Sequence, residues 1–181
     1  MRIIAGRYKG MRLHFPKSTH LRPTQDRVKE GLFSALSVRC EKANVLDLFC
    51  GSGSLGLEAL SRGALSVCFV DKDTRYVNRN LDTIDDNVDV VKKDVLGFLK
   101  TCNQSFDLIF LDPPWQSCSL FDRSLMAISE FGILKHSGMV VCEHPIAFTV
   151  SQCEGFSLFR SYRYGNTRVT ILEYNESNLS G

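Results

Sequence analysis

Three glycines between two acidic residues are the first group in this sequence whose spacing could do chemistry. Gly51, Gly53 and Gly56 match the pattern G-x-G-x-x-G, after an apolar run typical of a strand and before a stretch with helical spacing. Glycines in such a turn let a ligand approach the backbone, and the N–H groups of the next helix face that ligand. Asp71, after the next apolar run, could accept hydrogen bonds from ribose hydroxyls. The pattern predicts a nucleoside-binding site.

Two ligand classes fit this loop, a nicotinamide dinucleotide and S-adenosylmethionine. Asp47 precedes the loop and favours the second, because an acid suits the ammonium of a methionine moiety and would repel a pyrophosphate. A chain of 181 residues also leaves no separate substrate domain for a dehydrogenase. Phe49, which ends the same strand, and Asp94, after the third strand, complete the predicted cofactor residues. Asp94 could accept from an adenine amino group, cap the following helix, or do both.

The segment Asp112-Pro113-Pro114-Trp115 is the most specific signal and is the predicted catalytic segment. Two prolines cannot continue a strand ladder, and they stiffen the backbone where open α/β sheets bind ligands. The Asp112 carboxylate and the Pro113 carbonyl provide two acceptors for the two hydrogens of an exocyclic amine. Trp115 provides a flat face on which a base can stack. The segment therefore predicts alignment of a base amine with an electrophilic methyl group, without a general base or a metal.

The surrounding elements predict a doubly wound α/β sheet, because short apolar runs alternate with helical stretches from residue 44 onward. A helix is expected from Pro23 to about Val38. Two later runs joined at Gly165-Asn166 have no room for a helix between them and predict an antiparallel hairpin at the sheet edge. The expected strands are 45–49, 66–70, 88–91, 106–111, 139–142, 156–162 and 167–173, and the other expected helices are about 54–62, 73–85, 94–101 and 119–131.

Charge is unevenly distributed along the chain. Residues 1–30 hold eight basic and two acidic residues, a net charge of +6 against −4 for the rest of a chain of net charge +2. Residues 1–22 predict a basic β-hairpin extension, and such a segment suits contact with nucleic acid as well as a solvated surface. The basic side chains expected to contact RNA from this extension are Arg2, Arg7, Lys9 and Arg12.

Other chemistries find little support. Seven cysteines occur without a Cys-x-x-Cys pair, which argues against a zinc site or a disulfide framework and favours core positions. No apolar run approaches the ~20 residues that span a bilayer, and the charged N-terminus does not resemble a secretory signal. We therefore expect a cytoplasmic protein, and, because nothing resembles a dedicated dimerisation element, a monomer. The histidines at 14, 20, 136 and 144 lie in no motif and are expected to be structural or solvated.

Together these motifs resemble a known family. The segments 47–56 and 112–115 resemble amino-methyltransferases of nucleic acids. The RsmD family, bacterial 16S ribosomal RNA guanine-N2 methyltransferases, is similar at further segments that extend the likeness over about residues 2–173. These segments are Arg2-Ile3-Ile4-Ala5-Gly6, Leu21-Arg22-Pro23-Thr24, Arg27-Val28-Lys29-Glu30, Leu32-Phe33, Gly56–Gly63 and Tyr164-Gly165-Asn166-Thr167.

The resemblance implies a class I methyltransferase, with a Rossmann-like seven-stranded sheet over residues 23–174 and S-adenosylmethionine as cofactor. Residues 175–181, at the chain terminus, are expected to form a flexible tail. It implies methylation of one guanine on the small subunit or its assembly intermediate, with Arg22, Thr24 and Arg27 on the RNA side of the site. Trp115 stands where Phe or Tyr is common, and the same four residues occur in adenine-N6 RNA methyltransferases. Adenine-N6 methylation, a nicotinamide oxidoreductase and a non-catalytic RNA-binding module remain alternatives.

Overall fold

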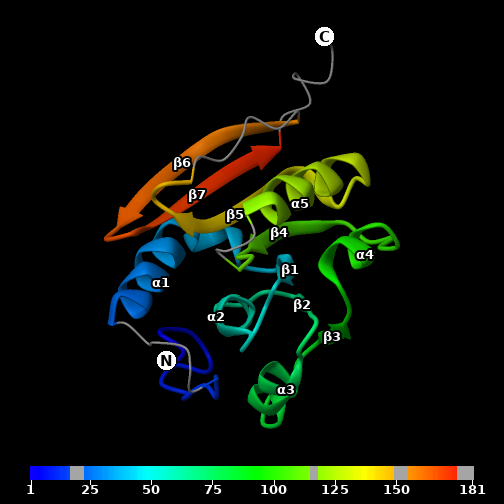
Figure 1. Ribbon diagram of the computed structural model, residues 1–181. Coiled ribbons are helices and arrows are strands. Elements are labelled where there is room, and N and C mark those ends of the chain that lie inside the picture. Colours follow the sequence, from blue (N-terminus) through cyan, green and yellow to red (C-terminus); the bar gives the residue numbers. More distant parts are fainter. Residues whose placement is uncertain (17–22, 115–117, 149–154, 175–181) are drawn as a thin grey trace.

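A seven-stranded sheet organises the protein, as the computed structural model shows for residues 1–16, 23–114, 118–148 and 155–174 (Figure 1). The strand order is β3-β2-β1-β4-β5-β7-β6. The strands are β1 Asn44–Leu48, β2 Ser66–Asp71, β3 Val88–Lys92, β4 Phe106–Leu111, β5 Leu134–Pro145, β6 Phe156–Tyr164 and β7 Thr167–Tyr174. The helices are α1 Pro23–Leu36, the short 3-10 helix η1 Ser37–Arg39, α2 Ser54–Ser61, α3 Arg75–Leu81, α4 Val95–Leu99 and α5 Cys118–Glu130.

Strand direction sets the position of the site. β1 to β5 are parallel, and β7 lies antiparallel between β5 and β6. The expected C-terminal hairpin is confirmed, with Gly165 at φ 60° in its turn. The chain runs from β1 outward to β3 and then returns to the other side of β1 as β4. The carboxyl ends of β1 and β4 therefore meet at the switch point where open α/β sheets bind ligands.

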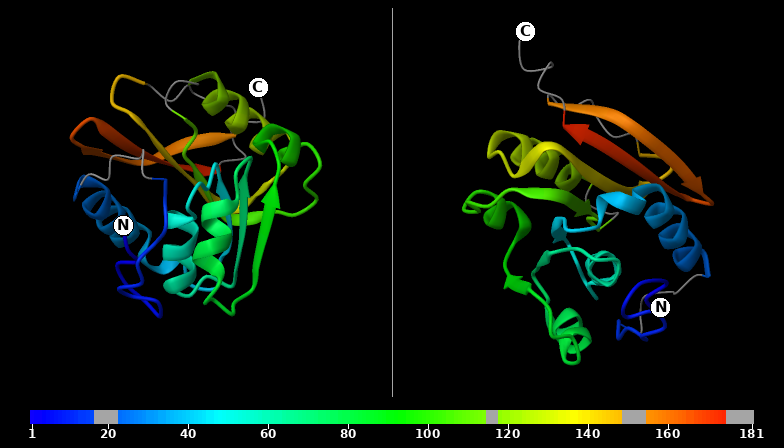
Figure 2. Two further views of the ribbon diagram at one scale, coloured as in Figure 1. Left: turned by 60° about the horizontal axis from the view of Figure 1, so that its bottom comes forward. Right: turned by 180° about the vertical axis from the view of Figure 1, so that it is seen from behind.

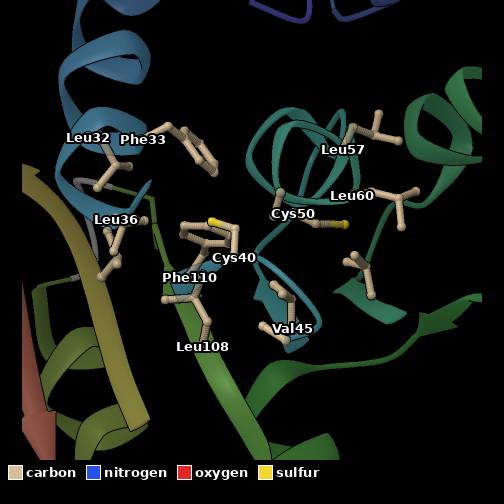
Figure 3. Packing of buried hydrophobic residues seen from close by; sticks show 14 of the residues in the cluster. Leu32, Phe33, Leu36, Cys40, Val45, Cys50, Leu57, Leu60, Leu108 and Phe110 are labelled. Carbon is tan, nitrogen blue, oxygen red and sulfur yellow. The ribbon is translucent and has the colours of Figure 1, made fainter. Parts of the chain in front are cut away.

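Helices cover both faces of the sheet, as expected for a doubly wound fold. Helices α1, α2 and α3 lie on one face and α4 and α5 on the other (Figures 1 and 2). The apolar side chains of each group pack in a separate cluster with that face. On the first face the rings of Phe33 and Phe110 lie 5.7 Å apart, with the buried thiol of Cys40 in the same cluster (Figure 3). Cys50, Cys68 and Cys142 are also buried, which agrees with their expected core role.

The N-terminal segment is not the predicted pair of strands. Among residues 1–16 the only β-pairing is a single antiparallel bridge between Arg2 and Arg12. The reason is that a neighbouring helix takes up backbone groups that a hairpin would have used. The amides of Ile4 and Ala5 donate to the Glu58 carboxylate at 2.8 and 3.1 Å, and other amides of the segment donate to Ser61 of α2. Backbone hydrogen bonds from Ile3 to Met11, from Gly10 to Ile3 and from Leu13 to Met1 still join its two arms, so the segment is a short hairpin-like loop docked against α2.

Some element boundaries also differ from expectation. β5 begins at Leu134 rather than at residue 139, and its pairing with β4 shifts register between Phe106 and Leu108. α3 covers only Arg75–Leu81 and α4 only Val95–Leu99. No helix among the described residues is long and apolar enough to cross a membrane.

Candidate active site

The three loop glycines have different tasks. Gly51 and Gly53 adopt positive φ angles of 53° and 75°, which favour glycine. A Cβ at Gly51 would meet nothing within 4 Å, so this turn faces open space. A Cβ at Gly53 would lie 2.7 Å from Val77, and one at Gly56 would lie 2.4 Å from the Phe69 ring. The first glycine therefore leaves room for a ligand, whereas the other two let α2 pack closely on the sheet.

Asp47 holds the loop onto the sheet. Its Oδ2 atom accepts a 2.9 Å hydrogen bond from the Gly56 amide, and the residue is only 3% exposed. Burial raises the pKa of Asp47 to about 7, although the Gly56 amide lowers it and the Asp71 charge adds to the rise. The side chain is thus a loop-positioning group in this structure. Contact between Asp47 and a ligand ammonium stays a prediction.

Asp71 and Asp94 lie at the ends of neighbouring parallel strands. Asp71 accepts from the Gly51 amide through Oδ2 and from the Asp73 amide through Oδ1, both at 2.9 Å. Asp94 caps α4 by accepting from the Gly97 amide at 3.1 Å, so its predicted capping role is confirmed. Its ion pair with Lys72, 2.9 Å long, holds the pKa of Asp94 below its usual value. A contact of Asp94 with adenine remains a prediction.

A pocket of about 470 Å³ opens at this edge, within the usual size range of small-molecule sites. Phe49 is in the left-handed region at φ 59°, a rare conformation for a bulky residue that is found at functional sites. Predicted cofactor and catalytic residues therefore share one pocket, although Asp47 and Asp94 are not part of its wall. Its lining residues are Phe49, Asp71, Lys72, Val95, Asp112, Pro113, Pro114 and Leu120.

Asp112 separates this pocket from a second, smaller cavity of about 80 Å³. Burial raises the pKa of Asp112 well above its usual value, and the charges of Glu143 and Asp47 raise it further. A buried carboxyl group next to other acids favours a ligand that supplies N–H donors or positive charge. The smaller cavity is lined by Met1, Val28, Lys29, Leu32, Ser54, Leu55, Asp112 and Glu143.

This electrostatic pattern tests which cofactor fits. Asp47, Asp71 and Asp112 place carboxyl groups around one switch point, and the pKa values of Asp47 and Asp112 are raised. Such a site suits a ligand with a sulfonium, an ammonium and a ribose, and it opposes the two negative charges of a dinucleotide pyrophosphate. The open space at Gly51 and the pocket volume leave room for such a ligand. The residues therefore fit S-adenosylmethionine.

Other predicted site residues have mixed outcomes. Trp115 and Arg22 lie outside the described residues, and Thr24 and Arg27 lie in α1. The predicted RNA-contact residues of the N-terminal segment are exposed. One of them already has a partner, because the Arg7 guanidinium is paired with Asp86, which also accepts from the Tyr8 hydroxyl at 2.7 Å. The exposed residues are Arg2, Arg7, Lys9 and Arg12.

Glu143 is a site residue that the sequence analysis missed. It follows Cys142, which pairs with Leu111 across the parallel strands β5 and β4, so Glu143 and Asp112 follow adjacent positions. The sequence did hold a signal for Glu143: it is an acidic residue after an apolar run, the same pattern that led to the prediction of Asp71. His144, by contrast, is 2% exposed, and its Nε2 lies 2.9 Å from the Thr170 hydroxyl, which confirms a structural role.

Fold and site together define a class I, S-adenosylmethionine-dependent methyltransferase. The comparisons with known proteins specify its family. The chain matches the family described as Conserved hypothetical protein 95 over residues 1–173. It is 36% identical over 180 residues to the "Putative rRNA methyltransferase YlbH" of Bacillus subtilis, covering 94% of this chain and 97% of that protein.

Two further relatives support the same assignment. The Ribosomal RNA small subunit methyltransferase D of Haemophilus influenzae is 39% identical over 151 residues, which cover 79% of this chain and 78% of that protein. The solved structure of the "Putative methyltransferase yhhF from Escherichia coli" superposes with a TM-score of 0.88 at 30% identity, covering 97% of this chain and 98% of that chain. The chain belongs to this RsmD/YlbH family of ribosomal RNA methyltransferases.

Proposed function

We propose that this protein transfers a methyl group from S-adenosylmethionine to the exocyclic N2 of one guanine in 16S ribosomal RNA of the small subunit. The observation that carries the proposal is the position of Asp112, which lies in the walls of both the larger pocket and the smaller cavity. Cofactor in the larger pocket and a base in the smaller cavity would have their reacting atoms beside Asp112.

The chain's own groups orient the nucleophile. The Asp112 carboxylate and the Pro113 carbonyl accept the two amine hydrogens, and the prolines at 113 and 114 hold both acceptors still. When bound, S-adenosylmethionine supplies an activated methyl group. With that group bound, the amine nitrogen held by Asp112 and Pro113 would accept the methyl group as the carbon–sulfur bond broke, and the nitrogen would then release one proton to water. Because the methyl group is already activated, orientation is the main requirement, and it can contribute roughly 7–11 kcal/mol.

Protonation of Asp112 depends on its surroundings. Burial and neighbouring acids favour the neutral form in the free protein. N–H donors of a bound amine and a nearby cation favour the ionised form, which accepts hydrogen bonds. Since His144 is bonded to Thr170 and packs edge-on against Phe121, it is not positioned as a general base.

RNA contact is assigned to the exposed basic residues of the N-terminal segment. Phosphate contacts from Arg2, Lys9 and Arg12 would make binding salt-dependent. Arg22, Thr24, Arg27 and a Trp115 stacked on the base complete the proposed RNA side. The proposed partner is the small subunit or its assembly intermediate, met by a cytoplasmic monomer. The name of the Haemophilus influenzae relative, a small-subunit ribosomal RNA methyltransferase, supports this substrate class.

Methyl transfer to unmodified bacterial small subunits tests the proposal. Radiolabelled S-adenosylmethionine is supplied with the wild-type protein and with Asp112→Ala, and the modified nucleoside is identified by mass spectrometry. Label in 16S RNA as N2-methylguanosine, absent with the variant, is the expected result. N6-methyladenosine would establish the alternative, adenine-N6 methylation. No label on subunits, naked RNA or DNA, despite cofactor binding, would contradict both.

A further inference from the structure

The smaller cavity, about 80 Å³, has room for the amine-bearing edge of a flat base. Val28 and Leu32 of α1 and Leu55 of α2 contribute apolar surface, whereas Asp112 and Glu143 contribute two carboxyl groups at the sheet end. Apolar walls with a few placed polar groups are typical of pockets that fix one ligand orientation. The two carboxyl groups therefore determine which edge of a base can enter.

Strand register explains why these carboxyl groups face the same cavity. Leu111 and Cys142 are paired neighbours on β4 and β5, and both pack in the cluster beneath α4 and α5. Successive side chains of a strand point to opposite faces. Asp112 and Glu143, the next residues, accordingly reach the other face, where α1 lies, and both line the cavity there. Glu143 is thus held within β5, and Asp112 is held by the first position after β4 and the prolines that follow it.

The chemistry of purines distinguishes between bases at such a pair. In guanine the exocyclic amine is flanked by the ring N1–H, a donor. In adenine the ring nitrogen beside the amine carries a lone pair and accepts. Consider a second carboxylate beside the one that holds the amine. It accepts a hydrogen bond from the N1–H of guanine, but it is repelled by the N1 lone pair of adenine.

We propose that Glu143 is a specificity-determining residue whose carboxylate accepts the hydrogen bond from guanine N1–H while Asp112 holds the neighbouring amine. This inference rests on the proposed function and deepens it, since Asp112 and Pro113 serve either amine. Burial raises the pKa of Glu143, so a donor at its carboxylate stabilises the charged form that the cavity itself disfavours. Lys29 contributes positive charge to the same cavity wall, although its ammonium also contacts Ser54 and Glu58.

The test replaces guanosine by an analogue that lacks the N1 hydrogen and, with it, the O6 carbonyl oxygen, so a Glu143 variant is needed to isolate the N1 contact. The methylated guanosine is mapped first, and subunits are then assembled with 16S RNA that carries guanosine or 2-aminopurine at that position. 2-Aminopurine keeps the exocyclic amine but has a lone pair at N1. The wild-type protein is expected to methylate guanosine about 10- to 100-fold faster than 2-aminopurine, the range for a hydrogen bond to a charged group.

Glu143→Gln is expected to reduce that preference about tenfold or more, because an amide can donate to the N1 lone pair of 2-aminopurine. Glu173→Gln is the matched control: the same change on neighbouring β7, at a residue paired with Met139 and outside the lining of both cavities. It should keep the wild-type preference. Calorimetry with S-adenosylhomocysteine shows whether each variant is folded, and Glu143→Asp replaces Glu143→Gln if that variant does not fold.

Each outcome is decisive. An unchanged preference in the folded Glu143 variant, or an equal loss of rate on both substrates, would overturn the proposed contact and leave Glu143 a structural group. Equal rates of the wild-type protein on the two bases would overturn it as well. Failure of the wild-type protein to form N2-methylguanosine on guanosine subunits would instead show that the proposed function itself is wrong.

Discussion

Two groups of acids in this protein have opposite electrostatic surroundings. At the joint between the N-terminal segment and α2, Glu58 is fully buried yet accepts from two backbone amides and pairs with Lys29 at 3.3 Å and Arg62 at 2.8 Å. At the sheet end, Asp112 and Glu143 are partly exposed in the wall of the same cavity, and the charge of Glu143 adds to the desolvation that raises the pKa of Asp112. A matched acid stabilises the fold, whereas unmatched acids prepare a site for the charge and donors of a ligand.

The largest expected effect is loss of the matched acid. Glu58→Ala leaves the buried Lys29 ammonium without its carboxylate and removes the acceptor of the Ile4 and Ala5 amides. We expect the free energy of unfolding to fall by about 3–5 kcal/mol, measured by urea denaturation. Glu30→Ala, at an exposed position of α1, is the control and should change it by less than about 0.5 kcal/mol. Similar small losses of unfolding free energy in both variants would show that the buried Glu58 contacts do not stabilise the fold.

Asp47 is predicted to make the protein less stable as pH rises, because its pKa is higher in the folded than in the unfolded state. The pKa of Asp47 is about 7 in the folded protein and 3.8 by its ordinary value, so between them only the folded state keeps this proton. The stabilisation it gives is therefore present at low pH and lost as pH rises through 7.

Asp47→Asn removes this titration and keeps an acceptor for the Gly56 amide. Relative to this variant, the wild-type protein should lose about 2–4 kcal/mol of unfolding free energy between about pH 4 and about pH 8. Parallel stability curves for the two proteins would mean that Asp47 is ionised throughout.

Activity and stability should separate at Asp112. Asp112→Ala removes an acceptor of the amine and is expected to lower methyl transfer about 100-fold or more, as loss of one orienting hydrogen-bond partner does elsewhere. It also removes a carboxyl group whose charged form desolvation and neighbouring acids disfavour, so the thermal unfolding midpoint should stay within a few degrees of the wild-type value or rise. If the variant were inactive and also strongly destabilised, Asp112 would be an acid that stabilises the fold, as Glu58 is.

The smallest effect concerns surface charge. Arg12 is exposed, and Arg12→Gln should reduce the slope of log affinity for RNA against log salt by about one. Arg7→Gln should reduce it less, because Asp86 already neutralises Arg7. Fluorescence titration at several salt concentrations measures both slopes. Equal reductions would show that the ion pair opens on binding.

Local patterns predicted the sheet well. The apolar runs at β1, β2 and β4 are buried from end to end or nearly so, and such runs identify strands without tertiary information. β5 was shortened in the prediction because Lys135, His136 and Ser137 interrupt its apolar character. The glycine loop and Asp112 were found because each is a contiguous motif at a strand end.

Contacts between distant segments were beyond local patterns. The predicted N-terminal hairpin is reduced to one bridge and a few flanking backbone hydrogen bonds, because the Glu58 carboxylate, 54 residues from Ile4, takes up the Ile4 amide. Glu143 was missed for a related reason: it has no motif of its own and gains meaning only from the register of β5 against β4. Both errors concern a carboxylate whose role is set by partners remote in sequence.

The joint at Glu58 also orders events during synthesis. Residues 4 and 5 leave the ribosome long before the carboxylate that binds their amides, with 54 residues between Ile4 and Glu58. At ~5–20 residues per second, the first segment waits several seconds for its acceptor. The wall that Met1 contributes to the smaller cavity consequently closes only after α2 has folded against the sheet. The N-terminal wall of the cavity therefore depends on α2, and the carboxyl groups of Asp112 and Glu143 join it later still, when β4 and β5 have been made.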